Sequence, residues 1–241
     1  MQNLKFSLAF LLHLICNKIN GCSFVKGLEI DVLRESFVYD IVTIVANNWA
    51  NIILCEVCMK HIKTKRLTIT LANLSDLPAL EEIERECDEY FNFDPPCATE
   101  HNRSLRECLT IGDIIPDIPE EDYLRENYIL CCVWQDGTLI GWLAYYLEYK
   151  QKNTAYLSLL YIKESHRADG IGAEIVEGLM QKLANAEYRE IKTHCSLRNA
   201  KSLRFWVKNG FNRITEVECN GNLTPENFGS LGLMKIIVSD K

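Results

Sequence analysis

Apolar residues recur with two different periods after residue 60, and the two periods predict strands and helices. Strict alternation of apolar and polar residues over 67–71 indicates a half-buried strand. Nearly continuous apolar runs, rich in β-branched and aromatic residues, indicate buried strands. The expected strands are residues 66–72, 128–135, 139–149, 154–162, 190–195, 211–217 and 231–238.

Helical spacing appears between these strands. Ile175, Leu179 and Leu183 recur on one helical face and predict a helix over 173–186. Asp136-Gly137 is typical of a hairpin turn, so the strands around it should form an antiparallel meander. The expected fold class is therefore α/β, with a mixed, mostly antiparallel central sheet flanked by helices. The other expected helices are residues 78–91, 104–111 and 199–208.

The length and composition suit one domain with an extension. The chain has 241 residues, of which 48% are hydrophobic and 24% charged. Residues 1–58 hold none of the six prolines and few charges, whereas Met59 begins a basic lead into the first expected strand. We predict an organised domain over 59–241. Residues 1–58 are then a small helical addition, or sequence upstream of the true start.

Two other interpretations of the extension are weaker. Residues 6–16 resemble the apolar core of a signal peptide, but a poor cleavage site follows and the run is too short to span a bilayer. Cys55 and Cys58 have the spacing of zinc ligands, whereas Cys16 and Cys22 do not form a matching pair. We therefore expect no metal site.

Charge and cysteine content narrow the class of protein. A net charge of -7 argues against binding nucleic acid through its phosphate backbone. Eleven cysteines, an odd number at irregular spacings, indicate reduced thiols, and Cys131-Cys132 lies inside an expected core strand. We expect a cytoplasmic protein that binds neither nucleic acid nor membrane.

The loop at residues 167–172 points to a ligand class. It joins a buried strand to a helix and contains Gly170 and Gly172. Glycines let the backbone approach an anion, and the first amides of a helix point at that anion with the positive end of the helix dipole behind them. The segment therefore predicts a cofactor that carries a pyrophosphate.

Two motifs resemble those of one known family. Residues 162–172 are similar to the signature of the Gcn5-related N-acetyltransferases, in which Arg/Gln-x-x-Gly-x-Gly/Ala binds the pyrophosphate of acetyl-CoA. Asn199-Ala200, Phe205-Trp206 and Gly210-Phe211 resemble the second motif of that family, in the right order. The similarity covers residues 59–241 and implies an acyl-CoA N-acyltransferase fold with acetyl-CoA as cosubstrate.

The resemblance also implies which residues hold acetyl-CoA. The end of the strand before the loop would pair with the pantetheine arm, the loop amides would hold the pyrophosphate, and Asn199 would hydrogen-bond the pantetheine. Arg167 would add positive charge near the phosphate oxygens. The implied cofactor-binding residues are Leu160, Tyr161, Ile162, Arg167, Ala168, Asp169, Gly170, Ile171, Gly172 and Asn199.

The acid and base of the reaction are harder to assign. Direct acetyl transfer needs a neutral amine nucleophile and a proton for the departing thiolate. The tyrosine that commonly serves as general acid in the family corresponds here to Trp206, whose indole cannot supply that proton. Glu148, expected on the strand facing the motif, is a candidate base, and Tyr156 is a candidate proton donor. His194 and Cys195 should point to opposite faces of a strand and so cannot act as a pair.

We therefore expect an acetyl-CoA-dependent N-acetyltransferase that acts on an amine of a small molecule or a protein, assembled as a homodimer. The acidic stretches at 81–89 and 120–122 suit a polyamine, an aminoglycoside or a protein amine, but equally a solvated surface. One alternative is a non-catalytic acyl-CoA-binding or regulatory module, suggested by Trp206. Another is a dinucleotide-binding protein, which would need a parallel sheet.

Overall fold

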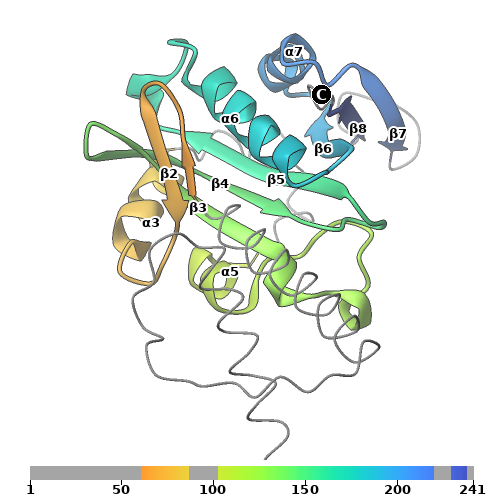
Figure 1. The fold of residues 1–241 in the computed structure, drawn as a ribbon, viewed down its shortest axis with the longest axis horizontal. Coiled ribbons are helices and arrows are strands. Elements are labelled where there is room, and N and C mark those ends of the chain that lie inside the picture. Colours follow the sequence, from red (N-terminus) through yellow and green to blue (C-terminus); the bar gives the residue numbers. More distant parts are fainter. Residues whose placement is uncertain (1–60, 87–102, 220–228, 238–241) are drawn as a thin grey trace, which may run out of the picture. The chain divides into compact units, whose positions relative to one another are not determined.

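A single mixed sheet organises the part of the chain that the structure describes. The computed structural model describes residues 61–86, 103–219 and 229–237, all within the unit Met59–Lys241. Its eight strands run in the order β1-β2-β3-β4-β5-β6-β8-β7 (Figure 1). Every neighbouring pair is antiparallel except β5 and β6. The expected α/β class is confirmed, whereas residues 1–58 lie outside the described residues and their role stays a prediction.

The strand and helix bounds follow the sequence pattern closely. The strands are β1 His61–Lys63, β2 Leu67–Leu71, β3 Tyr128–Gln135, β4 Thr138–Tyr146, β5 Thr154–Ile162, β6 Glu190–Ser196, β7 Arg213–Cys219 and β8 Gly229–Ile236. The α-helices are α3 Leu77–Glu86, α5 Leu105–Ile111, α6 Ile171–Asn185 and α7 Ala200–Lys208, and short 3-10 turns are η2 Glu120–Asp122, η3 Arg125–Asn127 and η4 Glu164–His166.

Two differences from the expected elements affect the site. Strand β1 was not expected, because three residues are too few to show a period; it pairs with β2, with His61 opposite Thr70. Strand β4 ends at Tyr146, three residues earlier than the expected strand over 139–149. Glu148 has a positive φ of 55° and therefore belongs to the turn after β4.

The sheet is covered on both faces. Helices α3 and α5 pack on one face over a core rich in aromatic side chains, which includes Trp142, Tyr146, Tyr156 and Tyr161. Residues that alternate with these along the strands, such as Leu143, are also fully buried. This second layer is explained by helices α6 and α7, which contact β5 and β6 (Figure 1).

The described cysteines agree with reduced thiols. Cys108, Cys131, Cys132 and Cys195 are buried thiols, and Cys219 is a half-buried thiol. Burial raises the pKa of the Cys132 thiol to about 12, so this thiol stays protonated. In the part of the chain that the structure describes, no helix has the length and apolar character needed to cross a membrane.

Candidate active site

The sheet divides between β5 and β6. Within the described residues these parallel strands pair only from Thr154 to Tyr156. Just beyond, the Oγ1 of Thr193 donates to the carbonyl of Leu157 at 2.9 Å. Past this point β5 continues beside β4, and β6 continues beside β8. The last residues of β5 therefore turn backbone N–H and C=O groups toward the division, where an amide-rich ligand can pair with them.

A β-bulge in β5 decides which of its side chains face the core beneath α3 and α5. The register between β4 and β5 shifts at Ala144, which leaves Ser158 as the extra residue of β5. Side chains alternate between the two faces of a strand, and one extra residue reverses that alternation. Tyr156 and Tyr161, five positions apart, therefore both join the core beneath α3 and α5.

The strand residues implied to bind the cofactor lie at the open end of β5. Tyr161 is buried, and its ring centroid is 4.6 Å from that of Trp142. Leu160 and Ile162 are half-buried on the opposite face. The pantetheine arm would meet their backbone rather than their side chains.

The loop after β5 leads into an open helix N-terminus. Gly170 has φ 77° and ψ 2°, a left-handed conformation that favours glycine, and Glu174 N–H donates to its carbonyl at 3.0 Å to begin α6. Within the described residues no side chain caps this end of α6. The first N–H groups of a helix have no intrahelical partner, so those of Ile171 and Gly172 suit a phosphate oxygen.

Arg167 and its neighbours are exposed on this loop. Arg167 Nε donates to the carbonyl of Ile162 at 2.8 Å, which ties its guanidinium to the end of β5. Ala168 has a left-handed φ of 65°, and Asp169 is exposed. The structure thus brings the implied loop residues together around the start of α6.

Gly172 faces the neighbouring helix α7, although it belongs to the loop segment 167–172. A Cβ on Gly172 would stand 2.9 Å from Cε2 of Phe205 and 3.4 Å from Cδ1 of Ile162. This glycine therefore lets α7 approach α6 closely. Gly170 is exposed, and a Cβ there would meet nothing nearer than the Nη2 of Arg66 at 3.7 Å.

Two residues of the second motif make contacts within the protein: Asn199 caps a helix and Trp206 packs against aromatic rings. Asn199 is buried and caps α7, its Oδ1 accepting the N–H of Ser202 at 2.9 Å. Trp206 is buried, with its ring edge-on to Phe205 and Phe211 at centroid distances of 4.8 and 5.1 Å. The indole that replaces the expected tyrosine therefore serves the packing of α7.

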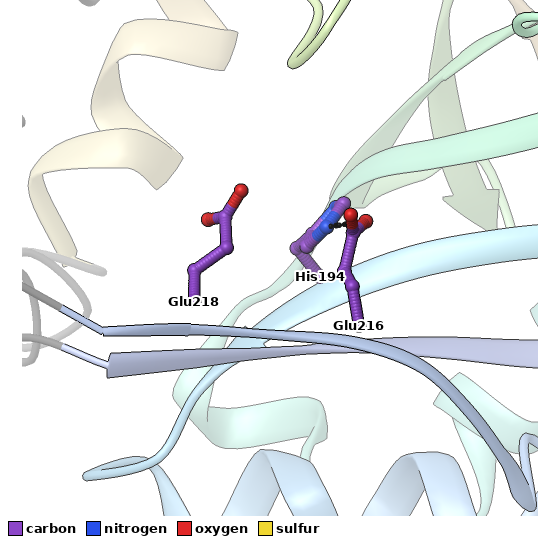
Figure 2. A group of neighbouring side chains, drawn as sticks. All are labelled: His194, Glu216 and Glu218. Carbon is purple, nitrogen blue, oxygen red and sulfur yellow. Dashed lines mark hydrogen bonds and ion pairs between the residues drawn. The ribbon is translucent and has the colours of Figure 1, made fainter.

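A hydrogen-bonded chain of three side chains lies beside the division, on the face of α3 and α5. The Nδ1 of His194 is 3.1 Å from the hydroxyl of Tyr156, and its Nε2 is 2.6 Å from Oε1 of Glu216. Figure 2 shows His194 and Glu216 facing each other, with Glu218 beside them. Burial raises the pKa of Tyr156 well above its usual value, so it is a neutral phenol.

Gly232 makes the contact between His194 and Glu216 possible. It lies on β8 between the two, opposite His194 on one side and Glu216 on the other. A Cβ at this position would stand 2.7 Å from Cγ of Glu216, in the path of that side chain. The glycine therefore lets Glu216 reach across β8.

Two more carboxylates lie near this hydrogen-bonded chain, Glu218 and Asp117, and Asp117 is ion-paired with Lys150 at 2.6 Å. Glu218 lies close enough that one ligand atom from each of His194, Glu216 and Glu218 falls within 4.8 Å of the others, a set that could hold a divalent cation. From the segment before β3, Asp117 accepts from the hydroxyl of Tyr149 at 3.2 Å. The ring of Tyr149 stacks on Tyr156 at 4.7 Å.

The two candidate catalytic residues are placed differently. Tyr156 stands at the division, in the hydrogen-bonded chain. The Oε2 of Glu148 accepts the N–H of Asn153 at 3.0 Å and so closes the turn between β4 and β5. His194 points away from Cys195, whose Sγ contacts the carbonyl of Asn199, as expected for adjacent strand residues.

Sequence reasoning did not single out Glu216, Glu218 or Gly232. The available signal was the i, i+2 spacing of Glu216 and Glu218, which places both on one face of a strand. That face meets His194 only because β8 lies between β6 and β7, and strand order is not written in the local pattern.

Comparison with known proteins agrees with this geometry. Residues 79–211, more than half of the chain, match the model of the acetyltransferase (GNAT) family. Comparison with curated proteins gives no match. The ribosomal L7/L12 alpha-N-protein acetyltransferase RimL, solved with coenzyme A, is similar in fold at 16% identity and a TM-score of 0.53, over 75% of this chain and 99% of RimL. An acetyltransferase from Thermus thermophilus is similar at 17% identity and a TM-score of 0.50, over 73% of this chain and 99% of that one.

These likenesses in fold accord with the family match over strands β3 to β6 and helices α6 and α7, which include the loop and both motifs. The cosubstrate is acetyl-CoA, and the reaction is transfer of its acetyl group to an amine. The chain belongs to the acetyltransferase (GNAT) family.

Proposed function

We propose that acetyl transfer takes place at the division between β5 and β6. The end of β5 and the loop at 167–172 would hold acetyl-CoA, which supplies the acetyl thioester. The uncapped start of α6 and the left-handed Gly170 support this placement, because both suit a pyrophosphate. The amine would approach from the face of α3 and α5, where Tyr156 meets His194.

The hydrogen-bonded chain Tyr156–His194–Glu216 carries the proposed proton transfer. An ionised Glu216 only accepts, so neutral His194 would donate from Nε2 and accept the Tyr156 proton at Nδ1. Tyr156 would take a proton from the attacking amine while passing its own to His194. Glu216 would stabilise the imidazolium at 2.6 Å. Return of the proton through Tyr156 would protonate the thiolate leaving group and restore the enzyme.

The acceptor in this proposal is a positively charged amine compound. Glu216 and Glu218 place two carboxylates beside His194, whereas Asp117 is already ion-paired with Lys150 at 2.6 Å. Carboxylates attract an ammonium group, and a cation held between them would present a neighbouring neutral amine to Tyr156. Glu148 has no part in this path, because its carboxylate closes a turn.

Steady-state kinetics of three variants test the proposal. We expect His194→Gln and Tyr156→Phe to lower kcat for release of CoA by about 10²- to 10⁴-fold, the usual contribution of a proton-transferring side chain. The Kd for acetyl-CoA should change less than twofold, because the phosphate loop lies elsewhere. His61→Gln, which removes an exposed imidazole on β1, is the matched control. Full kcat in His194→Gln with the preferred amine would refute the relay.

Gly232→Ala tests the relay without changing any of its members. The new Cβ would displace the Glu216 side chain from His194. We expect kcat to fall toward that of Glu216→Gln, and the double variant Gly232→Ala/Glu216→Gln to be no worse than Glu216→Gln alone. Additive losses in the double variant would contradict a shared role.

We further propose that the enzyme is a cytoplasmic homodimer with no nucleic-acid or membrane partner. The thiol state of the described cysteines supports a reducing compartment, and the net charge of -7 supports the lack of a nucleic-acid partner. Light scattering of the purified full chain tests the oligomeric state, and a monomer at micromolar concentration would refute the dimer.

A further inference from the structure

Arg66 joins the first hairpin of the sheet to the loop that precedes α6. It lies in the turn between β1 and β2, far in sequence from that loop. Its Nη1 is 3.0 Å from Oδ2 of Asp169, and its Nη2 donates to the carbonyl of Asp169 at 3.1 Å. Its Nε donates to Oε2 of Glu174 at 2.6 Å, and its backbone N–H donates to Oε1 at 2.8 Å. One residue thus ties together both sides of Gly170.

Glu174 is held as a carboxylate in the first turn of α6. Partial burial acts to raise the pKa of Glu174, but hydrogen bonds from Thr64 and Arg66 outweigh it and lower the pKa overall. The Oγ1 of Thr64 donates to Oε1 of Glu174 at 2.6 Å. The Glu174 side chain is 15% exposed, against 75% for Asp169. A fixed negative charge therefore stands at the helix end that suits an anion.

The hairpin that carries Arg66 is packed firmly against α6. A Cβ on Gly178 would stand 2.8 Å from Cγ2 of Thr64 and 3.0 Å from Cγ2 of Ile62, so the glycine permits close approach of α6 and the hairpin. The Nη2 of Arg66 would be the atom nearest to a Cβ on Gly170, at 3.7 Å. The guanidinium is thus fixed beside the glycine that opens the helix.

Charge explains what this arrangement would do for the cofactor. Asp169 and Glu174 bring two negative charges to the start of α6, and the positive charge of Arg66 leaves these three side chains with one net negative charge. Without Arg66 both carboxylates would oppose an approaching pyrophosphate, since like charges brought together weaken binding. Removing the guanidinium of Arg66 would also remove its hydrogen bonds to the side chain and the carbonyl of Asp169, so the backbone before Gly170 would no longer be held in place.

We propose that Arg66 is a positioning residue of the cofactor phosphate site: it fixes the loop before α6 and balances the charge of Asp169 and Glu174 so that this helix end accepts the pyrophosphate of acetyl-CoA. The inference rests on the proposed placement of acetyl-CoA at residues 167–172.

Calorimetry of the full chain with three ligands tests this role. The probes are acetyl-CoA, its 3′-dephospho form and acetyl-pantetheine, which lacks the pyrophosphate. For Arg66→Gln we expect Kd to rise on the order of tenfold for both phosphate-bearing ligands, a defect that shrinks as salt screens the repulsion, and by less than twofold for acetyl-pantetheine. Lys65→Gln, the same charge change at an exposed neighbouring position, should bind all three as the wild type does.

A second variant separates charge from geometry. Arg66→Gln/Glu174→Gln has the same net charge at this helix end as the wild type, and we expect it to recover most of the acetyl-CoA affinity. Equal losses for acetyl-CoA and acetyl-pantetheine would show a general structural defect and overturn the inference. So would a loss confined to the ligand with the 3′-phosphate, whereas no recovery in the double variant would refute the charge-balancing part of the role.

Gly170→Val distinguishes failure of this inference from failure of the proposed cofactor site. Valine is strained at a positive φ, so the variant should disturb the loop wherever Arg66 acts. If Gly170→Val weakens acetyl-CoA binding but Arg66→Gln does not, the role of Arg66 is refuted and the site stands. If neither variant changes Kd, the cofactor site itself is elsewhere.

Discussion

Replacing Gly170 with alanine should destabilise the apo protein and weaken the cofactor site for one and the same reason. The φ of 77° costs an L-residue about 1–2 kcal/mol relative to glycine. A Cβ here would meet only the Nη2 of Arg66 at 3.7 Å, an ordinary contact, so packing adds nothing to this cost. For a domain of this size, that loss of stability corresponds to a Tm lower by about 2–8 °C.

Thermal unfolding with and without acetyl-CoA measures both effects. At 100 times its Kd the ligand stabilises the wild type by about 2.7 kcal/mol, and a tenfold weaker affinity at the same concentration lowers this to about 1.4 kcal/mol. Gly137→Ala is the matched control, because Gly137 has φ 79° with nothing within 4 Å but lies in the hairpin between β3 and β4. It should lose similar stability and keep the whole ligand effect.

Two results would refute this reasoning. An unchanged Tm in Gly170→Ala would show that the backbone does not hold the left-handed conformation. A lowered Tm with an undiminished acetyl-CoA effect would show that the loop before α6 does not bind the pyrophosphate.

Three further predictions concern packing and ionisation. Gly172→Ala should cost about 1–3 kcal/mol by overpacking against Phe205, and Phe205→Leu in the same chain should recover part of it in thermal unfolding; additive losses would contradict the contact. Folding lowers the pKa of Glu174. The ionised Glu174 therefore stabilises the folded protein at pH values above its unfolded pKa of about 4.3. This stabilisation is lost as the pH falls through the folded pKa. The Tm difference between wild type and Glu174→Gln should therefore be seen at pH 7 and close in acid, and a constant difference would argue against ionisation. In alkylation at pH 8 followed by mass spectrometry, Cys219 should react before Cys132, whose burial raises the pKa to about 12; equal rates would contradict the burial.

The strands that the sequence predicted best are the most apolar ones. Strands β3 and β5 begin and end where the pattern predicted, because continuous apolar runs bounded by turn residues have few alternatives. The end of β4 was predicted wrongly, since Tyr149 extends the apolar run while Glu148 adopts a positive φ. Aromatic content alone could not show that the chain had already turned.

The two halves of the site differed in how far they could be predicted. The proposed cofactor loop is local: a strand, two glycines and a helix lie within one continuous segment, so the motif shows the arrangement of these elements directly. The proposed proton path needs four strands, β5, β6, β8 and β7, in that order. His194, Glu216 and Gly232 come together only through the order β6-β8-β7 and its register.

By itself the sequence determined the fold class, the strand–loop–helix segment at 154–185 and the identity of the acetyl donor, because each is carried by a contiguous pattern of residues. The tertiary structure decided which side chains meet at the division of the sheet. Pairing register and one bulge place Tyr156 beside His194, a missing Cβ lets Glu216 reach it, and a hairpin more than a hundred residues away brings Arg66 to the phosphate loop. These contacts depend on strand order and close approach, which no local periodicity encodes.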